Sequence, residues 1–182
     1  MKNTYKLKFT VLQYEILKVL SVKAGEKLNQ RQIALLLGVT SPAIAKALKP
    51  LTERELIITH RSPRMNLVEI ELNRRSRQAI VFKRAENLKT ITETGLDTAL
   101  EDIYPGTTII LFGSYARGED TTRSDIDIAV IGAEPKKTDL KEFEKLLERT
   151  ITIQHYTTLR DIRAELRSNI CNGITLIGAI EL

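Results

Sequence analysis

Hydrophobic residues in the first part of the chain follow two different periods. Over 10–23 and 30–37 the apolar positions recur at intervals of three and four residues, which is typical of amphipathic helices. A third segment of this kind begins at Ser41, which we expect to cap a helix. Residues 56–61 and 67–72 instead have the composition of two strands, separated by a basic segment rich in turn-forming residues. The pattern predicts three helices followed by a β-hairpin.

This order of elements is that of a winged helix-turn-helix, which we assign to residues 1–73. The third helix has Pro42 at its first helical position, where the missing N–H costs nothing. Pro50, later in the same helix, cannot bond to the Lys46 carbonyl and is expected to kink it. A helix of this size fits the DNA major groove, and a hairpin tip reaches phosphate or the minor groove. The predicted DNA-binding residues are Arg31, Ser41, Ala43, Lys46, Lys49, Arg61 and Arg64.

Charge separates the two halves of the chain. The whole sequence of 182 residues has a formal net charge of +5. Residues 1–89 carry 18 Lys and Arg against 7 Asp and Glu, a net charge of +11, whereas residues 90–182 carry 10 against 16, a net charge of −6. A basic half is suited to an anionic partner such as double-stranded DNA, with affinity supplied by displaced counterions. The asymmetry therefore predicts two small domains with different partners.

Residues 8–73 resemble the winged-helix domains of bacterial and archaeal regulators such as the MarR and ArsR groups. The resemblance rests on the pattern of elements and basic residues described above. It implies a transcriptional regulator that binds two DNA half-sites as a homodimer. The alternative is a winged helix that contacts another protein.

Residues 74–95 are predicted to form a basic linker helix, and residues 96–182 a second domain. Within that domain, 107–112 and 125–131 have the composition of strands. Helices are expected over 140–149, capped by Asp139, and from Thr157 or Thr158 through Arg167. The expected fold class is α+β, with a small mixed sheet in a two-layer α/β arrangement.

Two carboxylates lie on one of these strands. Asp125 and Asp127 are two residues apart, so their side chains share a face, about 7 Å apart along the strand. Such oxygen ligands suit Mg²⁺ or Mn²⁺, and they would repel each other without a cation. Upstream, Gly113 allows the backbone to approach a phosphate closely, with Ser114 and Arg117 as further phosphate-binding candidates. The segment predicts a site for a nucleoside triphosphate with its metal.

The string Leu111-Phe112-Gly113-Ser114-Tyr115-Ala116-Arg117-Gly118, followed by Ser124-Asp125-Ile126-Asp127, resembles the signature of the polymerase-β-like nucleotidyltransferases, in particular their minimal branch. The resemblance covers about residues 96–180. It implies a nucleotidyltransferase fold, with Asp125 and Asp127 as metal-binding and catalytic residues.

Active members of that superfamily usually add a third carboxylate on a later strand. Here the corresponding strand is expected at 150–156, where Thr152 stands in place of the acid and Gln154 is the next residue on that face. His155 is expected on the opposite face. Loss of the third ligand predicts weak chemistry or none, although nucleotide binding is compatible with it.

Three functions are consistent with these features. The first is a DNA-binding regulator whose nucleotidyltransferase-like domain binds Mg²⁺ and a nucleoside triphosphate. The second is an active enzyme that transfers NMP to a hydroxyl of a protein, a nucleic acid or a small molecule. The third, implied by the family resemblance, is an antitoxin that modifies a partner toxin. The sequence leaves enzymatic activity undecided.

Several other classes of protein are disfavoured by composition. One cysteine, Cys171, excludes a disulfide framework and a cysteine zinc site, and two histidines make a histidine metal site improbable. No apolar run approaches the length of a membrane span, and the N-terminal residues lack the apolar core of a signal peptide. We therefore expect a cytoplasmic protein without a membrane partner.

Overall fold

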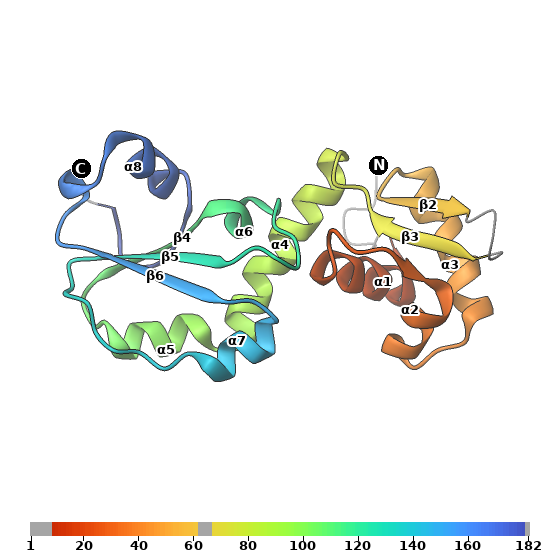
Figure 1. Ribbon diagram of the computed structural model, residues 1–182, viewed down its shortest axis with the longest axis horizontal. Helices are drawn as coiled ribbons and strands as arrows, with labels where there is room; N and C mark the ends of the chain where they lie inside the picture. The colour runs from red at the N-terminus through yellow and green to blue at the C-terminus, as the bar shows by residue number, and fades with distance from the viewer. Residues whose placement is uncertain (1–8, 62–66, 181–182) are drawn as a thin grey trace, which may run out of the picture. The chain divides into compact units, whose positions relative to one another are not determined.

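The computed structural model describes residues 9–61 and 67–180 (Figure 1). Its contacts divide the chain into two compact units, Met1–Ile80 and Val81–Leu182. Arg64 and the predicted hairpin tip around it lie outside the described residues.

The first unit has the order of elements of a winged helix-turn-helix, as predicted. Its three strands form an antiparallel sheet in the order β1-β3-β2. The elements are α1 (Val11–Val22), β1 (Leu28–Asn29), α2 (Gln30–Leu37), α3 (Ser41–Glu53), β2 (Ile57–Arg61) and β3 (Val68–Leu72). The core is made by apolar residues at helical spacing, among them Ile16, Leu20, Ile33, Ile44 and Leu48.

Local capping sets where the first two helices begin. Thr10 and Gln13 form a capping box at the start of α1, and Asn29 and Gln32 form another at the start of α2. Gly38 ends α2 in the left-handed conformation, with φ of 64°. Because these contacts are short-range, the sequence predicts closely where both helices begin and end.

The start of α3 differs by one residue from the prediction. Thr40 occupies the N-cap and makes no capping hydrogen bond through its side chain, so Ser41 is already helical and Pro42 follows it. The predicted capping role of Ser41 is therefore wrong. Because Pro42 needs only a position without an intrahelical N–H bond, it is accommodated anywhere in the first turn. The helix continues past Pro50 to Glu53.

The second unit contains a mixed four-stranded sheet in the order β6-β5-β4-β7 (Figure 1). β5 is parallel to β6, whereas β4 is antiparallel to both β5 and β7. The small mixed sheet predicted for this domain is confirmed. The strands are β4 (Thr108–Phe112), β5 (Ile126–Ile131), β6 (Ile151–Tyr156) and β7 (Ile174–Ile177).

Helices pack on both faces of the sheet, because apolar side chains along each strand point alternately to one face and the other. α5 (Leu96–Ile103) and α7 (Lys141–Leu147) pack with Ile109, Leu111 and Ile128 on one face, as does Ile91 of α4 (Arg77–Glu93). On the other face, Ile110, Phe112 and Ala129 pack against Ile162 and against Ile170 of α8 (Ala164–Cys171). Asp127 shares this second face, because strand residues two apart point the same way.

Two of the predicted helices differ in the structure. The helix expected from Thr157 or Thr158 through Arg167 is a short 3-10 turn, Leu159–Asp161, followed by an extended Ile162 and then α8. Thr158 and Asp161 form a capping box that encloses a single turn, which explains the misleading signal. Asp139 accepts a hydrogen bond from the Lys141 backbone N–H but is not the N-cap of α7, which is Leu140.

Within the residues that the structure describes, no single helix has the length and apolar character to cross a membrane. Helices α2 and α3 have the necessary length and apolar character only when they are taken together, and they are bent by 107° relative to each other.

Candidate functional site

A tight turn joins β4 to the short helix α6 (Gly113–Arg117), directly beside β5. Gly113 has φ of +74°, a conformation that L side chains rarely adopt. A Cβ atom built at this position would lie 3.1 Å from Cγ and 3.3 Å from Cβ of Asp127, and closer still to its Oδ2. Glycine at 113 therefore serves two purposes, since it permits the turn and leaves space for the Asp127 carboxylate.

Helix α6 carries the other two predicted phosphate-binding residues. Ser114 is half-buried in the first turn, and Arg117 is exposed in the last. Arg117 Nε donates a hydrogen bond of 2.8 Å to Glu119 Oε2. Burial and Asp125 raise the pKa of Asp127, and the positive charge of Arg117 offsets part of this rise, so the guanidinium lies within electrostatic reach of that carboxylate. The structure thus brings Gly113, Ser114 and Arg117 to the end of the sheet that holds Asp127.

The two acids occupy the start of β5. Asp125 is exposed and immediately precedes the strand, whereas Asp127 lies within it, opposite Phe112 of β4. Burial raises the pKa of Asp127 above its ordinary value, and the negative charge of Asp125 raises it further. The two carboxylates therefore repel each other, which is the condition that a bound cation relieves.

The strand register explains what replaces a third acid. Thr152 of β6 pairs directly with Asp127, so it occupies the neighbouring position on the same face of the sheet. The next residue on that face, Gln154, accepts a hydrogen bond of 2.7 Å from the Tyr156 hydroxyl. Among residues 9–61 and 67–180, no three His, Cys, Asp or Glu side chains are grouped to hold a metal ion.

His155 lies on the opposite face of β6 and takes no part in this arrangement. Its Nε2 lies 2.9 Å from the Tyr104 hydroxyl, which in turn lies 2.9 Å from Thr138 Oγ1. Burial lowers the pKa of this imidazole. His155 is part of the packing between the sheet and α5.

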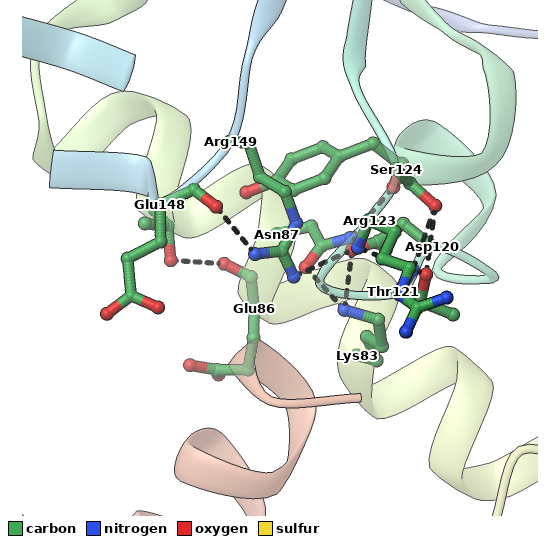
Figure 2. A network of polar contacts seen from close by, with 11 residues as sticks. Lys83, Glu86, Asn87, Asp120, Thr121, Arg123, Ser124, Glu148 and Arg149 are labelled. Atoms are coloured by element: carbon green, nitrogen blue, oxygen red, sulfur yellow. Dashed lines mark hydrogen bonds and ion pairs between the residues drawn. The ribbon is translucent and has the colours of Figure 1, made fainter. Parts of the chain in front are cut away.

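A buried polar network next to the site was not predicted from the sequence. It joins Lys83 and Asn87 of α4, Asp120 of the loop after α6, and Arg149 of the segment before β6 (Figure 2). The spacing of Lys83 and Asn87 places them on one helical face, which was a usable signal. Because Asp120 lies 37 residues beyond Lys83, the pairing itself could not be read from local sequence.

The predicted DNA-binding residues are all in the first unit. Arg31 of α2, Lys46 and Lys49 of α3, and Arg61 at the end of β2 are exposed. Ser41 and Ala43 are half-buried on α3. Lys49 also lies 3.9 Å from Glu53 in an exposed ion pair. The structure thus places three of these side chains on exposed positions of helices and leaves Arg64 outside its described part.

Comparison with known proteins identifies the second unit. Residues 94–172 match the family model of the nucleotidyltransferase domain, so this part of the chain carries such a domain. A putative protein adenylyltransferase of Methanocaldococcus jannaschii is 49% identical over 49 residues, which are 27% of this chain and 49% of that protein. The chain therefore spans about half the length of the curated relative it matches.

Solved structures similar to this chain include regulators. The adhesin competence repressor of Streptococcus pyogenes has a TM-score of 0.41 and 19% identity over 53% of this chain and 69% of its own. The zinc-responsive MarR family member ZitR of Lactococcus lactis has a TM-score of 0.39 and 28% identity over 57% of this chain and 68% of its own. The MepR–DNA complex of S. aureus has a TM-score of 0.39 and 22% identity over 52% of this chain and 73% of the MepR chain.

Proposed function

We propose that this chain is a DNA-binding transcriptional regulator whose nucleotidyltransferase domain binds a nucleoside triphosphate together with Mg²⁺. Binding of the nucleotide is proposed because the Asp127 carboxylate lies against the Gly113 turn, next to Asp125. Asp125 and Asp127 would hold the divalent cation, and the residues around the turn would hold the phosphates, whose charge the cation would offset.

The residues present fit Mg²⁺ or Mn²⁺. Asp125 and Asp127 supply the hard oxygen ligands that both ions prefer, and their mutual repulsion favours a cation. When bound, the ion would neutralise charge on the triphosphate. For the phosphates, Ser114 has a hydroxyl donor and Arg117 a positive charge, next to the turn at Gly113.

Titration of the full chain with Mg²⁺ and ATP tests this site directly. We expect Asp127→Asn to weaken binding of Mg²⁺–ATP at least tenfold, since it removes a charged ligand. The matched control is Asp102→Asn, because Asp102 is an exposed acid on α5, which packs on the other face of the sheet. Equal affinity of wild type and Asp127→Asn would show that the nucleotide site is elsewhere.

The winged helix is proposed to bind double-stranded DNA as a homodimer. Its support is the exposed basic side chains of α2, α3 and β2 within a half of net charge +11, on a fold whose third helix suits the major groove. Binding to duplex DNA should then fall steeply as the salt concentration rises. Affinity that does not change with salt would favour a protein partner for the winged helix.

Transfer of AMP to a protein is the second candidate function. It is favoured by the 49-residue match to a putative protein adenylyltransferase. Against strong activity stands Thr152, which occupies the position beside Asp127. Incubation with α-labelled ATP distinguishes the two functions, because only the enzyme would label a protein and Asp125→Ala would abolish that label.

A further inference from the structure

We propose that Asn87 of α4, acting with Asp120, is a positioning residue that holds both sides of the nucleotide and metal site in place. The inference rests on the proposed function and adds a set of buried residues to it. Asn87 and Asp120 are not among the predicted ligands, and their contribution is made through the two segments that carry those ligands.

The carboxylate of Asp120 is the centre of the buried network (Figure 2). It is 0% exposed, and its Oδ1 accepts a hydrogen bond of 2.7 Å from Asn87 Nδ2. Its Oδ2 accepts one of 2.9 Å from Lys83 Nζ, while Arg149 Nη2 lies 3.6 Å from the same oxygen. Removing one partner of a buried charge is costly because the remaining charge is left in a medium of low polarity. The loop that contains Asp120 is therefore anchored to α4.

This anchor lies five residues before Asp125, and the intervening chain is tightly turned. Thr121 N–H donates to Ser124 Oγ at 3.0 Å, and Ser124 N–H donates to Thr121 O at 3.0 Å. The Arg123 N–H donates to Thr121 Oγ1 at 3.3 Å. Directly after Asp125, the Ile126 N–H bonds to the Thr150 carbonyl at 2.8 Å, next to Arg149. Asp125 is thus held between a buried anchor and the start of β5.

The same amide of Asn87 also holds the other side of the site. Besides its bond to Asp120, Asn87 Nδ2 donates a hydrogen bond of 2.9 Å to the Tyr115 carbonyl in α6. Helix α6 carries Ser114 and Arg117, the predicted phosphate-binding residues. One side chain therefore spans the phosphate-binding helix and the loop that leads to the metal-binding acids. Its loss should loosen their relative placement rather than remove a ligand.

The variant Asn87→Leu tests this role, since it keeps a similar volume and removes both hydrogen bonds that Nδ2 donates, together with the bond of 3.4 Å that Oδ1 accepts from Lys83 Nζ. We would measure the affinity of the full chain for Mn²⁺ by electron paramagnetic resonance, in the presence of α,β-methylene ATP. Residues that orient metal ligands typically contribute about 10–100-fold to metal affinity, and a loss in this range is expected. The control is Tyr104→Phe, which removes the hydroxyl contacts with His155 and Thr138 elsewhere in the same unit. It should lower the melting temperature while leaving Mn²⁺ affinity unchanged.

A second variant, Ser124→Ala, loosens the same loop with little risk to folding, because Ser124 is only half-buried. It should weaken Mn²⁺ binding in the same direction, and it decides the matter if Asn87→Leu does not fold. Wild-type affinity in Ser124→Ala and in folded Asn87→Leu would overturn the positioning role alone. Failure of the wild-type chain to bind Mn²⁺ with the analogue would instead overturn the proposed function, and the positioning role with it.

Discussion

Replacement of Gly113 by alanine tests the connection between the turn and the carboxylate pair. The substitution adds one methyl group at a position with φ of +74°. That methyl group would meet the Asp127 side chain, whose Cγ and Cβ lie 3.1 and 3.3 Å from the site of the new atom. We expect two separate effects, a backbone cost and a displacement of Asp127.

The two effects differ in size and in what they alter. A left-handed backbone costs an alanine about 1–2 kcal/mol relative to glycine. Moving the Asp127 side chain away from its preferred rotamer adds about 0.5–1.5 kcal/mol. The free energy of unfolding should therefore fall by about 1.5–3.5 kcal/mol. Because the displaced carboxylate is a proposed metal ligand, affinity for Mg²⁺–ATP should fall at least tenfold, or about 1.4 kcal/mol.

Gly106→Ala is the matched control. Gly106 lies in the same unit with φ of +75°, and a Cβ there would meet nothing within 4 Å. Urea unfolding should show a loss of about 1–2 kcal/mol for this variant, from the backbone alone. Calorimetric titration with Mg²⁺ and ATP should show wild-type affinity. The difference between the two variants isolates the contact with Asp127.

An equal loss of stability in Gly113→Ala and Gly106→Ala, with wild-type binding of Mg²⁺–ATP by both, would contradict this prediction. That result would mean that the Asp127 carboxylate moves aside without consequence, and that its place beside the turn is incidental.

Three further predictions concern the acids, the missing third ligand and the DNA-binding surface. Burial and Asp125 raise the pKa of Asp127, so the ionised carboxylate destabilises the fold as the pH rises above 3.8. Asp127→Asn should therefore stabilise the metal-free chain against urea near neutral pH. A gain in stability that persists unchanged toward pH 3.8 would contradict this. Thr152→Asp places a carboxylate beside Asp127 and should increase Mn²⁺ affinity with nucleotide, whereas unchanged affinity would show that the register does not reach the metal. Lys46→Ala and Lys49→Ala should each reduce the slope of log affinity for duplex DNA against log salt by about 0.9 if each contacts one phosphate, while Lys141→Ala in the second unit should not.

The residues that were predicted correctly share a physical basis. The capping box of Asn29 and Gln32 and the left-handed end at Gly38 act within a few residues, so the sequence contains both partners. The alternation that predicted a shared face for Asp125 and Asp127 is likewise local, since successive side chains of a strand point to opposite faces. The capping box of Thr158 and Asp161 shows the limit of this reasoning, because a correct cap preceded only a single turn.

By itself, the sequence determined the winged helix-turn-helix order, the turn at Gly113 and the closeness of Asp125 and Asp127 at the start of β5, because each depends on neighbours close along the chain. The sequence already offered Thr152 at the position of the third acid, and the strand register pairs it directly with Asp127. Only the tertiary structure decided that Asp120 is a buried carboxylate held by Lys83 and Asn87. Strand register and the burial of a charge depend on contacts between distant segments, whose partners no local pattern specifies. The burial of Asp120 and its bonds to Lys83 and Asn87 therefore became visible only in the folded chain.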